Sequence, residues 1–251
     1  MNLTLYGVDI WSTALVFARV GAMVMLLPGF GEPSIPPRIR LGFALMLAVA
    51  LAPAVSVHAP APTDTALGIA GQVMSETLIG VMLGGAARLL VSALATAGQA
   101  IGLEMGLSFA QTADPTMTGS GQLLAVFLGL MGIALIFATG LHHMFLLGVA
   151  GSYEFIAPGS TPPVGDGAQL ALDATARSFL VGFQIATPLI AAGLIFRLGL
   201  GVLSRLIPQI QVFFVALPLQ MLGGFVVLAL GLSTGMLVWL DSLQAYATWL
   251  R

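Results

Sequence analysis

The stretch LLAVFLGLMGIALIFATGLHHMFLLGVAG, from Leu123 to Gly151, carries no acidic residue, lysine or arginine, and its only titratable side chains are His142 and His143. A helix of about 20 residues crosses the hydrocarbon core of a bilayer, so a run this long and apolar predicts a membrane helix. Five further apolar runs occur along the chain. They are Ile10–Phe30, Leu41–Val57, Leu67–Ala87, Ser178–Phe196 and Val212–Leu240. The sequence therefore predicts an all-α membrane protein with about six apolar helical segments.

The overall composition excludes most other classes of protein. Of the 251 residues, 58% are apolar and only 7% are charged, and the mean hydropathy is +1.03. Soluble domains carry about 25% charged residues, and a disordered chain would not expose this much apolar surface. A disulfide scaffold is excluded because the chain has no cysteine. The net charge is −2, which provides no basic patch for nucleic acid.

The connections between the apolar runs predict an orientation. With the N-terminus outside, five arginines fall on the cytoplasmic side and two on the external side, as the positive-inside rule requires. The first group is Arg38, Arg40, Arg88, Arg197 and Arg205, and the second is Arg177 and Arg251. Pro158–Gly167 is expected to be a non-helical loop. Arg88–Gln122 is expected to be a connection with a helical first half and a second half rich in Gly, Thr, Ser and Pro.

Three acidic or basic residues lie inside or beside the apolar runs: Arg19, Glu76 and Glu104. Charges within a membrane are costly, which makes them candidates for function. We expect each to pair with a partner, on this chain or on a neighbouring subunit, and so to serve assembly. Close helix packing is predicted where glycines recur at every fourth position. The main series is Gly98, Gly102 and Gly106, and a shorter one is Gly80 and Gly84.

The sequence contains no enzyme motif and predicts no catalytic, cofactor-binding or metal-binding residue. His142 and His143 are adjacent, so on a helix they are expected to point about 100° apart rather than share a face. Two other classes stay open on these residues alone. An ion or small-molecule transporter would depend on titration of Glu76 or Glu104, and a membrane-embedded enzyme would depend on the histidines.

Three parts of the chain together resemble the FliR family of the flagellar type III export gate. The first has Arg19 and Pro28, followed by the turn Pro36-Pro37-Arg38-Ile39-Arg40. The most specific is GQAIGLEMGLSFAQTADP, residues 98–115. The third has Arg205, Pro208-Gln209, Phe213 and Pro218-Leu219. One departure is Gly121-Gln122-Leu123-Leu124, where family members often begin the next helix with a Pro-Val-Leu pattern.

The resemblance implies a non-enzymatic subunit of the inner-membrane gate at the flagellar basal body, without a cofactor. It implies a FliP-like region over residues 1–175 and a FliQ-like helical hairpin over residues 176–251. The implied partners are FliP-like and FliQ-like subunits, FlhB-like and FlhA-like export components, membrane lipid and the exported unfolded flagellar proteins. In such an assembly the segments form kinked hairpins packed against other subunits rather than simple bilayer crossings. A virulence export gate is the alternative within the same fold.

The segment Gly106–Gln122 is predicted to plug the pore. A channel for unfolded chains needs a movable closure of small and apolar groups rather than a charged ring. The resemblance points the same way, because the corresponding loop of that family lies in the pore. The residues expected to form the plug are Leu107, Phe109, Thr112, Asp114, Pro115 and Met117. An ordinary surface loop between two helices is the alternative.

Overall fold

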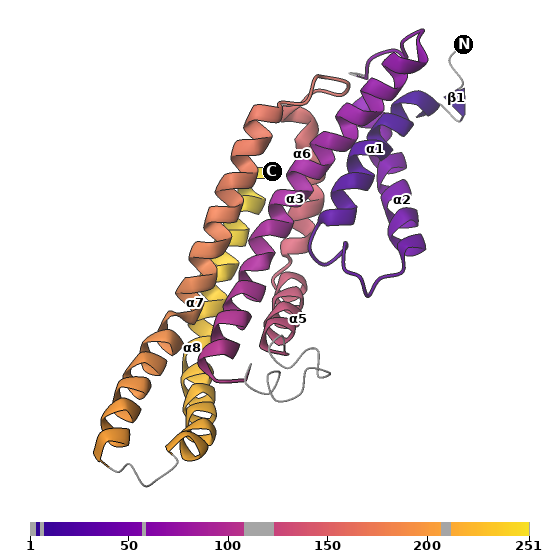
Figure 1. The fold of residues 1–251 in the computed structure, drawn as a ribbon. Helices are drawn as coiled ribbons and strands as arrows, with labels where there is room; N and C mark the ends of the chain where they lie inside the picture. Colours follow the sequence, from indigo (N-terminus) through magenta and orange to yellow (C-terminus); the bar gives the residue numbers. More distant parts are fainter. Residues whose placement is uncertain (1–3, 6–7, 57–58, 108–122, 207–211, 251) are drawn as a thin grey trace. The chain divides into compact units, whose positions relative to one another are not determined.

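The computed structural model describes residues 4–5, 8–56, 59–107, 123–206 and 212–250, and this part of the chain is almost entirely helical (Figure 1). Its elements are β1 (Thr4–Leu5), β2 (Val8–Asp9), α1 (Ile10–Leu26), α2 (Pro37–Val55), α3 (Ala66–Glu104), α5 (Leu123–Ala138), α6 (Leu141–Phe155), α7 (Val164–Leu206) and α8 (Val212–Leu250). β1 and β2 form a short antiparallel pairing. The predicted all-α fold is confirmed, with this pairing as a small addition.

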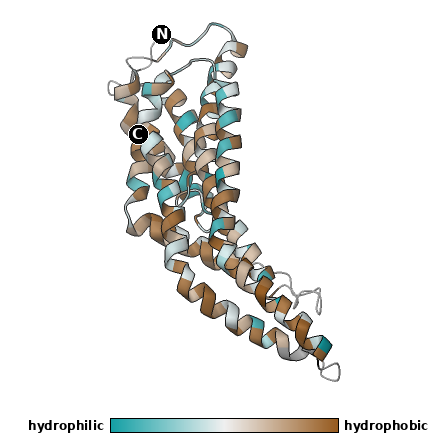
Figure 2. Cartoon of the chain, turned by 90° about the vertical axis from the view of Figure 1, so that its left-hand side faces the viewer, coloured by the Kyte–Doolittle hydropathy of each residue, from teal (hydrophilic) through white to brown (hydrophobic). Residues whose placement is uncertain are grey.

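Several helices are long and apolar enough to cross a membrane. Among the described residues these are α2, α3, α7 and most of α8, with a fifth span if α5 and α6 count as one broken helix. Hydrophobic residues run along the whole length of these helices (Figure 2). Many of them face outward; Leu67 is 84% exposed and Leu230 is 77% exposed. Large apolar surfaces of this kind require lipid or another protein to cover them.

α3 is a single helix of 39 residues that runs through Arg88. The predicted helical first half of Arg88–Gln122 is confirmed, but it continues the helix of the apolar run Leu67–Ala87 instead of forming a separate connection. No proline interrupts the hydrogen bonds of α3, and an arginine can carry its charge to the edge of a helix on its long side chain. Arg88 does so by pairing with Glu32, with 2.5 Å between Nη1 and Oε1. Arg88 therefore lies within α3, and the orientation of the chain stays a prediction.

The apolar run Leu123–Gly151 forms two helices, α5 and α6, rather than one. Gly140 lies between them with φ of +74°, a left-handed conformation that glycine adopts without strain. The next predicted boundary also shifts, because α7 begins at Val164, inside the predicted loop Pro158–Gly167. The two prolines before Val164 are compatible with this start, since proline is tolerated at the first turn of a helix.

The described chain divides into two compact units. The first contains residues 1–90, 136–175 and 243–251, and its core includes Leu15, Val20, Ile79 and Phe145. The second contains residues 91–135 and 176–242, and its core includes Leu94, Met105, Leu128 and Trp239. Both are built from segments far apart in sequence. The likeness of residues 1–175 and 176–251 to two partner families stays a prediction.

Candidate functional site

Arg19 lies in the middle of α1, and its side chain is fully buried against Glu76 of α3, which is also fully buried. The two side chains form a bidentate ion pair. Nε donates to Oε2 of Glu76 over 2.6 Å, and Nη2 donates to Oε1 over 3.1 Å. The planar guanidinium thus binds both carboxylate oxygens, the strongest geometry for such a pair.

The other donors of Arg19 bind backbone carbonyls at the end of α6. Nη1 donates to the carbonyls of Ser152 and Ile156 over 3.1 and 2.8 Å, and Nη2 donates to that of Ala157 over 3.4 Å. The last carbonyls of a helix lack partners within the helix, and a positive charge is favourable beside them. All five N–H groups of the guanidinium are therefore used.

Glu76 makes a further bond to the loop between α6 and α7. Its Oε1 accepts a hydrogen bond of 2.6 Å from the backbone N–H of Gly159. The ring of Tyr153 covers the guanidinium, with its centroid 4.2 Å from Cζ of Arg19, which adds a cation–π contact. The Arg19–Glu76 pair thus joins α1, α3, the end of α6 and the following loop.

Glycines allow α1 and α3 to approach closely around this pair. Gly80, one turn after Glu76, lies against the backbone carbonyl of Arg19. One turn further on, a Cβ atom at Gly84 would come within 2.8 Å of the carbonyl oxygen of Met23. The spacing of four residues places both glycines on the face of α3 that meets α1.

The role of this cluster is structural. Both charges are held in fixed bonds that replace the water they lost on burial. Removing one partner would leave the other charge buried and unpaired, at a cost of about 3–5 kcal/mol. The cluster therefore ties four segments of the chain together only as long as both residues are present.

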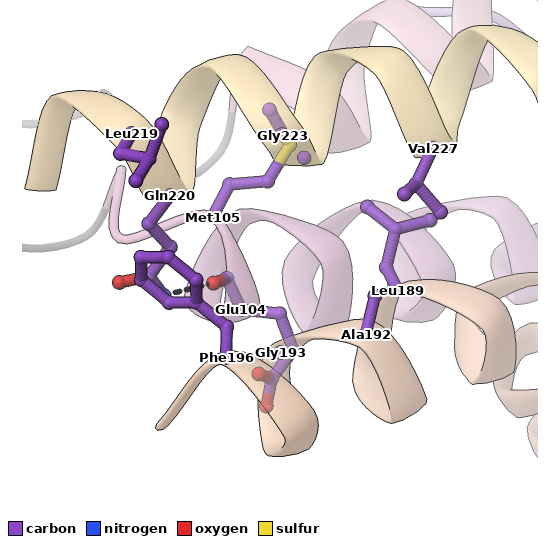
Figure 3. A pocket seen from close by; sticks show the side chains of 11 residues that line it. Glu104, Met105, Leu189, Ala192, Gly193, Phe196, Leu219, Gln220, Gly223 and Val227 are labelled. Carbon is purple, nitrogen blue, oxygen red and sulfur yellow. Dashed lines mark hydrogen bonds between the residues drawn. The ribbon is translucent and has the colours of Figure 1, made fainter. Parts of the chain in front are cut away.

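Glu104, the last residue of α3, borders a cavity of about 210 Å³ between α3, α7 and α8 in the second unit (Figure 3). Its Oε2 lies 2.9 Å from Nη2 of Arg197, in an ion pair without the geometry of a hydrogen bond. The side-chain amide of Gln220 donates to the backbone carbonyl of Glu104. Arg197 is 51% exposed, so water weakens this ion pair far more than the Arg19–Glu76 pair.

Gly106 ends α3 with a hydrogen-bonded cap. Its φ is +74°, and its N–H bonds to the carbonyl of Leu103 over 3.1 Å. The N–H of Leu107 bonds to the carbonyl of Gly102 over 3.0 Å. This pair of bonds is the Schellman motif, which favours glycine at the left-handed position. α3 therefore ends at the start of the segment predicted to be the plug.

The three glycines predicted to pack closely have different surroundings. Gly98 lies directly against the backbone of Ala125 in α5, so α3 and α5 touch there. Gly102 is buried and accepts the bond from Leu107. Gly106 serves the cap, and a Cβ atom there would lie 3.3 Å from the side chain of Leu217.

Of the predicted plug residues, only Leu107 belongs to the described part of the chain. The others lie outside the described residues: Phe109, Thr112, Asp114, Pro115 and Met117. The role of the segment as a plug stays a prediction. So does the role of Arg19, Glu76 and Glu104 in assembly.

His142 and His143 are adjacent residues in the first turn of α6, and their ring centroids are 4.0 Å apart. Within the described ranges, no group of three or more His, Asp or Glu residues comes close enough to hold a metal ion.

Sequence reasoning missed the partners of these charges. Arg197 directly follows one apolar run and Gln220 lies inside the next, and their separation from Glu104 in sequence hid the cluster. The carbonyls of Ser152, Ile156 and Ala157 carry no signal in the sequence, because every residue has one. Gly159 carried a signal in its residue type, because glycine adopts the left-handed conformation of a tight loop without strain. Its φ in the structure is +72°.

Comparison with known proteins places the chain in a family. It matches the family described as Bacterial export proteins, family 1, over residues 10–246. It is 45% identical to flagellar biosynthetic protein FliR of Caulobacter vibrioides over 241 residues, which are 96% of each chain. The Escherichia coli protein of the same name is 35% identical over 213 residues, 84% of this chain and 80% of that protein. The Bacillus subtilis protein is 30% identical over 222 residues, 87% and 85% of the two chains.

These matches confirm the resemblance drawn from the sequence motifs. They extend over nearly the whole chain, including α1 with Arg19, α3 with Glu76 and Glu104, and α7 with Arg197. The chain belongs to the bacterial export proteins, family 1, together with flagellar biosynthetic protein FliR.

Proposed function

We propose that the chain is a subunit of the inner-membrane gate through which a bacterium exports flagellar proteins. The observation that carries this proposal is the match to an export family over residues 10–246, with 45% identity to a flagellar biosynthetic protein over 96% of both chains. The long apolar helices support a membrane location. The flagellar names of the relatives favour the flagellar over the virulence branch.

The partners in this proposal are FliP-like and FliQ-like subunits, which form the channel with this chain. FlhB-like and FlhA-like components and the exported unfolded proteins are its further partners. The outward apolar surface supports an assembly of this kind. On α7, Ile195 is 70% exposed and Leu198 is 66% exposed, and on α8 Leu222 is 66% exposed. Subunit packing would remove such side chains from water and lipid alike.

Within this gate, Gly106–Gln122 plugs the idle channel. Its composition of small, polar and apolar residues supports this role. The helices that flank this segment on both sides are also held in place. Gly106 caps α3, while the contact of Gly98 with Ala125 holds the first turn of α5 against α3. A segment anchored at both ends can move without being lost from the channel.

A complementation assay tests the proposed function. A strain that lacks this chain is expected to export no flagellar filament protein into the medium and to be non-motile. A plasmid that encodes the wild-type chain should restore both, and so should Gly85→Ala, because no atom lies within 4 Å of the added methyl group. Normal filament export in the strain that lacks the chain would contradict the proposal.

A further inference from the structure

A groove of about 910 Å³ opens in the first unit, between the end of α6, the start of α7 and the end of α8. One wall is aromatic. The rings of Phe155 and Trp249 stack with centroids 6.5 Å apart, and Tyr246 lies 5.7 Å from Trp249. The hydroxyl of Tyr246 donates to the carbonyl of Leu83 over 2.7 Å, which fixes this wall to α3. Phe155 is 69% exposed and Trp249 is 57% exposed, so a large part of each ring is open.

The part of the lining contributed by α7 is acidic. Asp166, Gln169 and Asp173 line the groove from α7, and their spacing of three and four residues places them on one face of the helix. The amide of Gln169 donates to Oδ1 of Asp173 over 3.0 Å. Neither aspartate takes part in the ion pairs formed within the described residues, and no arginine is among the residues that line the groove.

The loop between α6 and α7 adds an unsatisfied polar group. Ser160 lines the groove, and its Oγ is buried without a hydrogen-bond partner among the described residues. A buried hydroxyl in this state indicates a missing partner. Beside it, Met82, Leu83, Leu170 and Leu250 provide apolar surface. The groove thus combines apolar contact, open aromatic faces and two unneutralised carboxylates.

We propose that this groove docks a segment of a neighbouring protein subunit in which a lysine or arginine lies between aliphatic residues. The cation would lie between the carboxylates of α7 and the aromatic faces of α6 and α8, both of which attract it. The aliphatic residues would pack on the apolar floor. A phospholipid fits less well, because the two carboxylates repel its phosphate. This inference rests on the proposed function, since it requires an assembly of several subunits.

Site-directed photo-crosslinking in the full assembly tests the docking. A benzophenone amino acid at Thr161, an exposed residue that lines the groove, is expected to cross-link one peptide of another subunit that contains Lys or Arg. The control probe is placed at Ala168, which is exposed on α7 but does not line the groove. It should not cross-link that peptide.

Charge variants then test the chemistry of recognition. Asp166→Asn together with Asp173→Asn should lower the cross-link yield about tenfold, the loss expected for charge-assisted bonds. Asp241→Asn removes an exposed charge of α8 outside the groove and should leave the yield unchanged. In a second step, Asp173→Arg should lose the cross-link, and changing the basic residue of the identified peptide to Asp should restore it.

The outcomes separate this inference from the proposed function. If the assembly is intact but the Thr161 probe cross-links only lipid or nothing, the inference is wrong and the proposed function stands. A cross-link that persists unchanged in the double Asn variant overturns the charge-based recognition. If the chain forms no assembly with other subunits, the proposed function fails and the inference fails with it.

Discussion

The guanidinium Nε of Arg19 lies 2.6 Å from Oε2 of Glu76, although 57 positions separate the two residues in the chain. Both side chains are fully buried, and between them they bind α1, α3 and the end of α6. A change at either residue therefore acts on several segments at once.

Arg19→Ala should destabilise the protein by about 3–5 kcal/mol, because it leaves the carboxylate of Glu76 buried without its cation. The expected phenotype is loss of complex assembly rather than altered export specificity. Arg19→Lys should rescue little, since an ammonium group cannot make the five bonds of the guanidinium. Complex recovered from solubilised membranes measures the effect.

The matched control is Arg88→Ala, which breaks an ion pair whose arginine is 41% exposed. It should cost no more than about 1 kcal/mol. A double-mutant cycle of Arg19→Ala and Glu76→Ala should show strong coupling, because each single change already forfeits the pair. Normal recovery of the complex from an Arg19→Ala strain would rule out the structural role of the pair.

Two adjacent glycines of α3 provide a second comparison. Gly84→Ala should destabilise the protein by about 1–3 kcal/mol, because its Cβ atom would come within 2.8 Å of the carbonyl oxygen of Met23. Gly85→Ala enters open space and should be neutral or stabilising by up to about 1 kcal/mol. Thermal unfolding in detergent, followed by tryptophan fluorescence, compares the two. Equal midpoints for both variants would contradict the close contact of α1 and α3.

The cap at the end of α3 predicts a third effect. Gly106→Ala places a Cβ atom on a residue with φ of +74°, which costs about 1–2 kcal/mol. Gly129→Ala is the control, because it lies inside α5 with no atom within 4 Å of the new methyl group. The same unfolding measurement applies. A Gly106→Ala protein as stable as the Gly129→Ala protein would show that the cap contributes nothing.

Deletion of about ten residues around Asp114 should make the membrane leak ions or small molecules, because an idle export channel needs a closure. The complex should still assemble, since the charge clusters at Arg19 and Glu104 remain. Uptake of a small dye or sensitivity to a normally excluded antibiotic measures the leak. A deletion strain with an assembled complex, a tight membrane and normal export would show that the segment is not a plug.

Much of the helical fold was predictable because long apolar runs have few alternatives in a membrane protein. The boundaries were less predictable. Arg88 marked the end of an apolar run in sequence, yet its long side chain lets the same helix continue through it. Gly140 resembled an ordinary membrane glycine, yet its left-handed backbone divides the apolar run Leu123–Gly151 into two helices.

The candidate site was predictable only in part. Arg19 and Glu76 stood out because charges are rare in apolar runs, and pairing was a natural expectation for them. Their carbonyl and amide partners at Ser152, Ile156 and Gly159 were hidden, since backbone groups are the same in every residue. Distance in sequence likewise hid the contact of Glu104 with Arg197. Such partners follow from the path of the chain in three dimensions rather than from residue type.

The mass of the native particle tests the central claim most directly. The chain would be tagged at its C-terminus, expressed in its own bacterium, solubilised mildly and measured by native mass spectrometry. The account predicts a particle far heavier than the 25.8 kDa of the chain, containing several other small hydrophobic subunits. A single, well-folded species at 25.8 kDa, in a strain that exports filament protein normally, would contradict it.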